Sequence, residues 1–489
     1  MKKSTLYSII LGAAISLSSC VDLEEAPESK QSADNFYQNG EDAISAVNAI
    51  YRGLNEGTGQ SLYNSLMQIG TEMATDDYEA GPRARNPHVR AISGLTHDAS
   101  NDRMQELWRQ SYGIVNRANV AIDRIALIGP DNISDALRRR TTGEAKFLRA
   151  LAYFNLARWF GGVPLALHET PEALYVANAT EAEVYAQIIA DLSDAESLLP
   201  APAEYGEQDA GRATAGAAKS LLAKVYLTQK DWENARKKSR EVIDLQWYGL
   251  FEDFADVFNV ATKNGKEHIF SVQFKGYANF VGNCMAGRSA PTSDEVPGVN
   301  GDYADALHAE GGLYSSFGDR DRRKAVTFVT EMVSPADGQR YTFIPHIHKY
   351  YDPAAVGDQY NSSSKNLPVI RYAELLLIYA EALNEEHNGP TQEAYDAIDT
   401  VRTRAGIPKL EQNLSADQFR DSVFQERRKE LVFEYQRWFD LSRRGAGYYV
   451  ATLHAAGKTA AAPRHVKFPI PQRELDLNPS LKQNPEWRK

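Results

Sequence analysis

Apolar side chains recur at helical spacing along most of this chain, and that period constrains the fold more than any other feature. The clearest run is EAKFLRALAYFNLARWF at residues 144–160, where Phe147, Leu151 and Phe154 share one stripe. Gly161-Gly162 and Pro164 follow it, a combination that ends helices. The same period returns at residues 180–199, 214–245, 371–386, 391–405 and 416–443. The sequence therefore predicts a mainly α-helical protein.

The predicted helices fall into pairs with the spacing of small and aromatic residues that is typical of tetratricopeptide repeats. The matching triplets are Ala223, Tyr226 and Ala235, and Ala380, Leu383 and Ala394. The run at 214–245 is expected to break near residues 229–231, and 144–160 should pair with 180–199. The glycine typical of the repeat is missing, so ordinary helix packing stays open as the alternative. We expect tetratricopeptide-like helical pairs, an α–α superhelix, as the scaffold.

The run at 416–443 predicts one long helix rich in charged residues. Its arginines are expected to pair with acids of the same run, some of them one helical turn apart. The residues concerned are Arg427, Arg428 and Arg437, with Glu430, Glu434 and Asp440. These pairs are interpreted as part of the scaffold.

Residues 246–370 depart from the helical pattern, because Gly, Pro, Ser, Asn and aromatic residues become frequent there. Short alternating runs at 269–274 and 340–344 predict strands. Residues 70–103 form a second loop-rich stretch. Long irregular segments within a helical scaffold are where binding sites usually lie. We therefore expect an N-terminal helical region at 35–245 and a C-terminal region at 246–489 that contains a loop-rich, irregular ligand-binding insertion at 246–370.

The first residues indicate an exported lipoprotein. Lys2 and Lys3 precede an apolar stretch at 6–17, which is shorter than the roughly 20 residues of a membrane span and suits a signal peptide. The ending Leu-Ser-Ser-Cys resembles a bacterial lipobox, in which the cysteine thiol receives the lipid. We predict a signal peptide at 1–19 and lipidation at Cys20; a secretory peptide with an incidental cysteine is the alternative.

The segment that follows Cys20, residues 20–34, is polar, acidic and free of aromatic residues, so it predicts a flexible tether. Asp22, Glu24 and Glu25 resemble the acidic signal that sends some lipoproteins to the outer leaflet. A tether that is merely solvated is the alternative interpretation of these acids.

Composition and motifs exclude several function classes. The net charge is −11, which argues against nucleic acid as the main partner. Cys284 is the second of two cysteines and provides no disulfide framework. Gly457-Lys458-Thr459 lacks the earlier glycine of a phosphate-binding loop, and His346 and His348 lack a third metal ligand nearby. No catalytic residue, cofactor or metal is predicted, and the residues do not settle whether a loop binds calcium.

Aromatic residues stand out, with 25 Tyr, 18 Phe and 6 Trp. Sugar rings stack on aromatic planes, while Asp, Asn and Arg side chains hydrogen-bond the hydroxyls. The candidate ligand-binding residues are the loop aromatics Tyr78, Tyr277, Phe280, Tyr303, Tyr314 and Phe317, with the polar neighbours Asp76, Asp77, Arg83 and Arg85. The alternative is that these side chains pack loops onto helices.

The loop at 70–103 also holds a basic cluster, formed by Arg83, Arg85, His88, Arg90 and His97. In an acidic protein such a cluster favours an anionic ligand. A solvated or locally salt-bridged loop is the alternative interpretation.

Several segments together resemble the SusD/RagB family of surface nutrient-binding lipoproteins. They are ADNFYQNGEDAISAVNAIYRGL near the start, EAKFLRALAYFNLARWFGGVP at 144–164, RYAELLLIYAEALNE at 371–385, ERRKELVFEYQRWFDLSR at 426–443 and PIPQRELDLNPSLKQNPEW at the end. The likeness covers nearly the whole chain. The loop tryptophans typical of the family are not evident, which argues against a flat starch-type stacking platform.

The resemblance implies a non-enzymatic protein, lipid-anchored at the outer face of the cell outer membrane. Family members cap a TonB-dependent transporter barrel of the SusC type, and the pair imports oligosaccharides or, in some cases, peptides. Family ligand residues sit in variable loops, so none is carried over to this sequence. A peptide-binding member of the family, a surface glycoside hydrolase and a purely structural adaptor are the alternatives.

Overall fold

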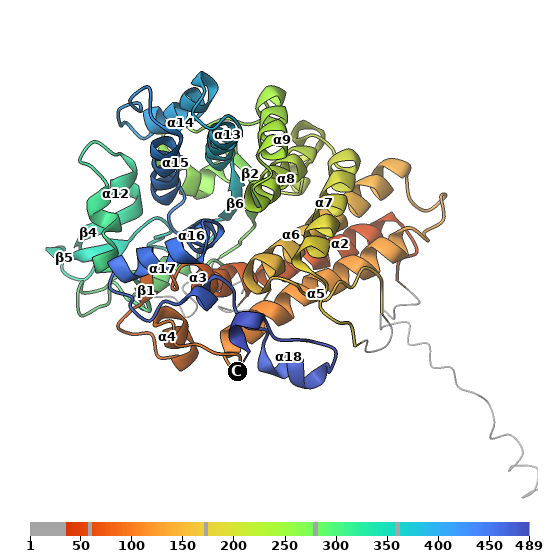
Figure 1. Cartoon of the computed structure of the whole chain (residues 1–489), viewed down its shortest axis with the longest axis horizontal. Coiled ribbons are helices and arrows are strands. Elements are labelled where there is room, and N and C mark those ends of the chain that lie inside the picture. The colour runs from red at the N-terminus through yellow and green to blue at the C-terminus, as the bar shows by residue number, and fades with distance from the viewer. Residues whose placement is uncertain (1–35, 57–60, 171–174, 277–281, 357–361, 489) are drawn as a thin grey trace, which may run out of the picture.

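The computed structural model describes residues 36–56, 61–170, 175–276, 282–356 and 362–488, and helices dominate it (Figure 1). The predicted signal peptide, the tether and Cys20 lie outside the described residues, and so do Tyr277 and Phe280. None of the described helices combines the length and the apolar composition needed to cross a membrane.

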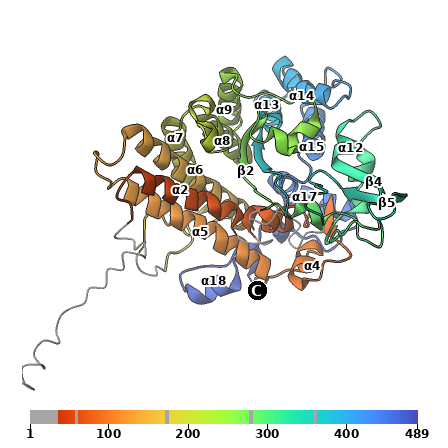
Figure 2. The same cartoon turned by 180° about the vertical axis from the view of Figure 1, so that it is seen from behind.

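Eight helices stack side by side in an array that follows the chain. They are α2 (Gly40–Asn55), α5 (Asp102–Ile125), α6 (Asp135–Phe160), α7 (Glu181–Leu198), α8 (Ala215–Gln229), α9 (Trp232–Leu245), α13 (Tyr372–Glu386) and α14 (Gln392–Arg404). Helix α6 packs on α5 and α7, α8 on α7 and α9, and α13 on α9 and α14. Figures 1 and 2 show the array from opposite sides. The predicted helical pairs are confirmed, including the break between α8 and α9.

Local signals explain where these helices begin and end. Thr180 and Glu183 form a capping box at the start of α7, which satisfies backbone N–H groups that have no partner within the helix. Helix α6 ends at Gly161, whose φ of +76° is costly for a residue with a side chain. The second half of α6 is buried on all sides, as expected for a central helix.

The loop-rich insertion leaves the array after α9 and returns to it at α13, which itself packs on α9. Strands β2 (His268–Val272) and β6 (Leu367–Arg371) pair antiparallel and join the two ends of the insertion. The second predicted strand corresponds to β5 (Arg340–Ile347), which forms a hairpin with β4 (Phe328–Val333). The two strands predicted at 269–274 and 340–344 are therefore confirmed.

A third antiparallel pair connects the two loop-rich stretches. Strand β1 (Tyr78–Ala80) pairs with β3 (Asp305–Leu307), with Tyr78 opposite Leu307 and Ala80 opposite Asp305. Helix α4 packs on β1, and further short helices lie in or next to the two loop-rich stretches. The short helices are η1 (Leu62–Leu66), α3 (Met67–Thr71), α4 (Pro87–Ser93), α10 (Met285–Arg288), α11 (Leu313–Ser316) and α12 (Arg323–Thr327). Segments more than 200 positions apart in the numbering thus meet at one place.

The prediction of a single helix at 416–443 is wrong. The structure has α15 (Ala416–Glu430) and α16 (Arg437–Arg443), separated by a turn in which Phe433 and Tyr435 have φ of +58° and +64°. Buried side chains occupy the carbonyls that a continuous helix would need: Lys349 Nζ donates to Val432 O at 2.8 Å. Arg371 Nη2 donates to Glu430 O at 2.8 Å. The remaining helices are α17 (Ala446–Ala455) and α18 (Gln472–Leu477).

The ion pairs expected within that run are mostly tertiary instead. Arg427 does bind Asp440, at 2.9 Å. Arg428 and Arg437, by contrast, contact the carboxylates of Asp77 and Asp76 in the 70–103 stretch. Glu430 and Glu434 bind Arg371 at 2.8 and 2.6 Å. The turn between α15 and α16 separates the residues that helical spacing would have paired.

Candidate functional site

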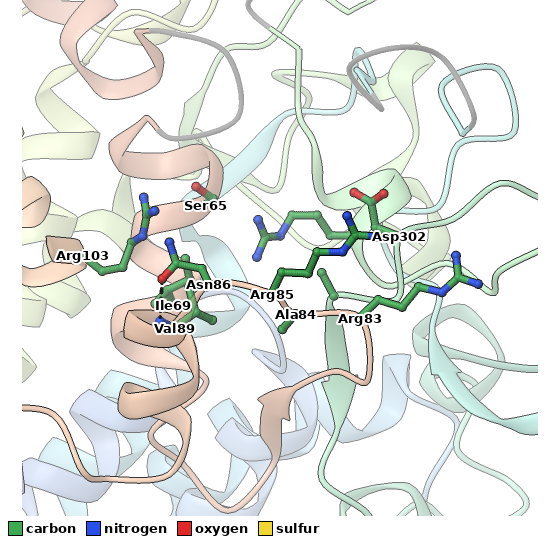
Figure 3. A pocket seen from close by; sticks show the side chains of 11 residues that line it. Ser65, Ile69, Arg83, Ala84, Arg85, Asn86, Val89, Arg103 and Asp302 are labelled. Carbon is green, nitrogen blue, oxygen red and sulfur yellow. Dashed lines mark hydrogen bonds between the residues drawn. The ribbon is translucent and has the colours of Figure 1, made fainter. Parts of the chain in front are cut away.

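A pocket of about 420 Å³ opens where the two loop-rich stretches meet (Figure 3). Its lining comprises Ser65, Ile69, Arg83, Ala84, Arg85, Asn86, Val89, Arg103, Arg288, Asp302 and Ala304. In the view of Figure 3, Arg103 and Asn86 lie at one end, Arg83 and Asp302 at the other, and Arg85 between them. The volume lies within the roughly 300–1,000 Å³ range of small-ligand sites.

Backbone contacts fix the loop that carries Arg83 and Arg85 against the insertion. Gly81 N donates to Ala304 O at 2.8 Å, and Arg83 N donates to Tyr303 O at 3.3 Å. A Cβ at Gly81 would lie 2.3 Å from Tyr303 O, so only glycine allows this approach. The predicted loop at 70–103 and the predicted insertion therefore form one surface.

Arg90 holds the same loop from the other side. Its Nε donates to Ala84 O at 2.7 Å and its Nη2 to Pro82 O at 3.2 Å. Asn86 caps α4, accepting from His88 N at 2.8 Å, with Pro87 as the first helical residue. The loop thus presents Arg83 and Arg85 from a braced backbone.

Four of the lining side chains are arginines: Arg83, Arg85, Arg103 and Arg288. Arg288 Nη2 binds Asp305 at 2.7 Å, and Arg103 lies 3.3 Å from Asp102. Burial works against the charge of Arg288, but Asp305 outweighs it and raises the pKa of the guanidinium. Arg288 is therefore a fixed cation on the inner side of the pocket.

Arg83 and Arg85 have a different environment. Arg83 pairs with Asp294 at 2.6 Å, yet their side chains are 45% and 81% exposed, so this pair is weak. Arg85 is exposed and has no carboxylate partner among the residues that the structure describes. Both guanidiniums are available to a ligand, and Asp302 is the one acid in the lining. The pocket is a cationic, hydrogen-bond-donating surface.

The structure therefore brings two predicted candidates, Arg83 and Arg85, into one pocket. Tyr303 lies at its edge, between the lining residues Asp302 and Ala304, and its ring packs on His346 with centroids 4.2 Å apart. Tyr314 lies elsewhere: it is half-buried against Phe328. The predicted roles of Tyr277 and Phe280 lie outside the described residues.

Four other candidates are buried, and their environment argues against ligand binding. Asp76, Asp77, Tyr78 and Phe317 are 3%, 2%, 0% and 1% exposed. Asp76 binds Arg437 at 2.6 and 2.8 Å, and Asp77 binds Arg428 at 2.9 Å.

Burial raises the pKa of Asp76, but Arg437 outweighs it and holds that pKa below its ordinary value. These carboxylates join the 70–103 stretch to helices α15 and α16. They are scaffold contacts that the sequence could not distinguish from a site.

The other residues that line the pocket were not predicted from the sequence. Arg103 is the second residue of helix α5, and Arg288 ends the short helix α10. Both lie within the predicted loop-rich stretches, but neither is among the candidate residues named from the sequence. Asp302 immediately precedes the predicted Tyr303, which is the only local signal for it. No group of three or more His, Cys, Asp or Glu side chains in the described part of the chain could hold a metal ion.

An array of paired helices that carries a loop-lined, cationic pocket defines a class of helical-repeat binding proteins. Two family models match this chain: the SusD family over residues 324–487, and a SusD-like family described as starch-binding and associating with the outer membrane over residues 23–227. SusD-like protein P2 of Formosa agariphila is 30% identical, over 99% of both chains. The chain belongs to the SusD family.

Solved structures agree with this assignment. A SusD homolog from Bacteroides thetaiotaomicron superposes with a TM-score of 0.81 at 25% identity, covering 93% of this chain and 98% of that one. A laminarin-binding SusD-like protein superposes with a TM-score of 0.77 at 26% identity, covering 92% of this chain and all of that one (100%). The mainly α-helical, tetratricopeptide-like fold predicted from the sequence is confirmed.

Proposed function

We propose that this protein is a non-catalytic, lipid-anchored protein of the outer cell surface that captures an oligosaccharide and delivers it to a TonB-dependent transporter. The lipobox-like ending at Cys20 and the acidic tether support the anchor. The family description, starch-binding and associating with the outer membrane, and the laminarin-binding structural relative support the ligand class and the location.

The observation that carries the proposal is the pocket built from both loop-rich stretches. Guanidinium groups donate several hydrogen bonds in a fixed fork, which suits the paired acceptors of a sugar. Asn86 and Ser65 supply further polar groups, and Ile69 and Val89 supply apolar surface. Because Arg85 is exposed with no carboxylate partner in the described structure, and Arg83 has only a weak exposed pair with Asp294, we expect the oligosaccharide to carry carboxylate or sulfate groups.

Capture requires no chemical step. The ligand binds a surface that is already formed, because Arg90 and the β1–β3 pair hold the loops in place. Delivery follows when the whole protein moves as a lid over the transporter barrel, with the helical array as the rigid part. The lipidated tether at 20–34 then keeps the protein attached to the membrane during this motion.

The test is calorimetric titration of the mature lipoprotein in detergent with neutral and acidic oligosaccharides, including oligogalacturonides and their methyl esters. Binding of an acidic oligosaccharide that is recovered unchanged would support the proposal, and esterification should weaken it. Arg85→Gln should weaken binding about tenfold. Arg236→Gln, which changes a partly exposed arginine on α9 paired with Glu386, is the control. Absence of glycan binding across the panel would contradict capture by this pocket.

The same titration separates the alternatives. Binding of peptides in place of glycans would make this the peptide-binding kind of family member. Release of shorter sugars would make it a glycoside hydrolase. Asp76 and Asp77 do not favour that outcome, since both are buried and held by arginines. Transporter delivery is tested separately, by whether the tagged protein co-purifies a barrel protein from solubilised outer membranes.

A further inference from the structure

A second pocket, of about 430 Å³, shares no lining residue with the first. It lies between the C-terminal end of α6, the start of α7, the end of α8, helix α16 and residues 466–467. It brings together the two sequence runs 144–160 and 426–443, which sequence analysis interpreted as scaffold. Nothing in the proposed capture mechanism uses this pocket.

Arg158 is the unusual residue in its lining. The side chain is clamped between two aromatic rings, with Cζ 4.0 Å from the Phe154 centroid and 3.5 Å from the Phe439 centroid. The residue is only 7% exposed, and Nη2 donates to Asn155 Oδ1 at 2.7 Å. Its Nε is buried and has no hydrogen-bond partner within the described structure.

Neighbouring cations each have a carboxylate. Arg443 binds Glu381 and Asp440 at 2.8 and 2.9 Å. Lys467 binds Glu181 at 2.8 Å. Arg158 has no acid within ion-pair distance among the residues described here, so one positive charge on this wall is uncompensated.

An uncompensated buried charge is costly, because the ring faces replace only part of its hydration. Burial lowers the pKa of Arg158 to about 10. Ser442 adds a second unused group, since its buried Oγ also lacks a partner in the described part of the chain. The lining of this pocket therefore contains two polar groups without a hydrogen-bond partner in the described structure, Arg158 Nε and Ser442 Oγ.

We propose that this pocket is a second ligand site, which binds a small carboxylate through Arg158 and Ser442. One uncompensated guanidinium matches one carboxylate in charge, and its planar fork matches two carboxylate oxygens in shape. A phosphate dianion would need a second free cation. The volume leaves room for a sugar-sized body beside Tyr185 and Gln229, so a sugar acid is a suitable probe.

The test is the thermal unfolding midpoint of the mature lipoprotein in increasing sodium glucuronate. Glucose with sodium chloride at equal ionic strength is the control, and inorganic phosphate is a second probe. A ligand that binds only the folded state raises the midpoint with concentration. Glucuronate should raise it, and glucose and chloride should not.

Paired variants locate the effect. Arg158→Gln should abolish the glucuronate-dependent shift, whereas Arg85→Gln, in the first pocket, should keep it. If Arg158→Gln does not fold, Ser442→Ala replaces it and should weaken glucuronate binding several-fold. A crystal soaked with glucuronate then decides whether the carboxylate contacts Arg158.

Three results would overturn the proposal. They are the absence of a glucuronate-dependent shift, a shift lost in Arg85→Gln but kept in Arg158→Gln, and a larger shift with phosphate than with glucuronate. The outcome is independent of oligosaccharide capture, because Arg85 tests the first pocket and Arg158 the second.

Discussion

Arginines occupy two contrasting environments in this protein. At the centre of the C-terminal half, Arg371 is 1% exposed and contacts Glu267, Glu430 and Glu434 at 2.7, 2.8 and 2.6 Å. At the rim of the first pocket, Arg83 is 45% exposed beside Asp294, which is 81% exposed. Arg371 belongs to a larger buried ion network. It comprises Arg323, Arg371, Arg404 and Lys349 with Glu267, Asp321, Glu426, Glu430 and Glu434.

The difference shows that charge alone does not identify a ligand site. In the buried ion network every cation contacts at least one buried carboxylate and cannot exchange it for a ligand without leaving a buried charge unpaired. At the pocket rim, water already competes with each partner, so a ligand can replace it at little cost. The ion-pair partners of an arginine and its exposure to solvent therefore distinguish a structural arginine from one that can bind a ligand.

The largest expected effect comes from breaking the network. Arg371→Met leaves Glu267, Glu430 and Glu434 short of a partner, so the free energy of unfolding should fall by about 3–5 kcal/mol. Guanidinium chloride titration measures it. Arg340→Gln, which removes an exposed pair with Glu331, is the control and should cost less than about 1 kcal/mol. Equal losses in both variants would contradict the comparison.

Asp76→Asn separates scaffold from site. It weakens the contact with Arg437, so we expect a loss of about 2–3 kcal/mol in unfolding free energy. Oligosaccharide affinity should not change, because Asp76 is buried away from the pocket. Urea denaturation and calorimetric titration measure the two quantities. If the variant folds but no longer binds the oligosaccharide, Asp76 contributes to ligand binding and the comparison is wrong.

The buried acids also predict how stability depends on pH. Burial raises the pKa of Asp440, but Arg427 and Arg443 outweigh it and lower the pKa to about 2. The folded pKa lies below the unfolded one, so this stability is present above about pH 4 and is lost as the pH falls toward 2. Asp440 alone should contribute about 2 kcal/mol.

Glu430 shifts in the same direction, because Arg404 and Arg371 outweigh its burial. Denaturant titrations between about pH 5 and 2 measure the slope. Asp440→Asn should flatten it, and an unchanged slope in that variant would refute the assignment.

The smallest expected effect on stability is at the pocket rim. Arg85→Gln should change the unfolding free energy by no more than about 0.5 kcal/mol, because the side chain is exposed. It should nevertheless weaken oligosaccharide binding about tenfold. Thermal unfolding and calorimetry on the same preparation measure both, and a large loss of stability would place Arg85 with the structural arginines.

Helix positions were predictable from local patterns. Residues 180–199 and 214–245 carry their own period, caps and breakers, and the structure places α7, α8 and α9 there. The break after Glu430 was not predictable, because its cause is the capture of backbone carbonyls by Lys349 and Arg371. Both side chains lie more than 50 positions away in the sequence.

The candidate site was predictable only in part for the same reason. Arg83 and Arg85 stood out because basic residues cluster in one loop of an acidic chain. Asp76 and Asp77 stood out equally, yet their partners come from α15 and α16 and make them structural. Arg103 and Arg288 gave no signal, since each reaches the pocket only through tertiary packing.

By itself, the sequence determined the helical scaffold, the family and the position of the loop-rich insertion, because period, caps and glycines act over a few neighbouring residues. Only the tertiary structure decided which charges are paired and which are available. Whether a charged side chain is available to a ligand depends on its ion-pair partners and on its exposure to water. In this fold, segments far apart in the sequence are brought together, as β1 and β3 are, and they supply those partners.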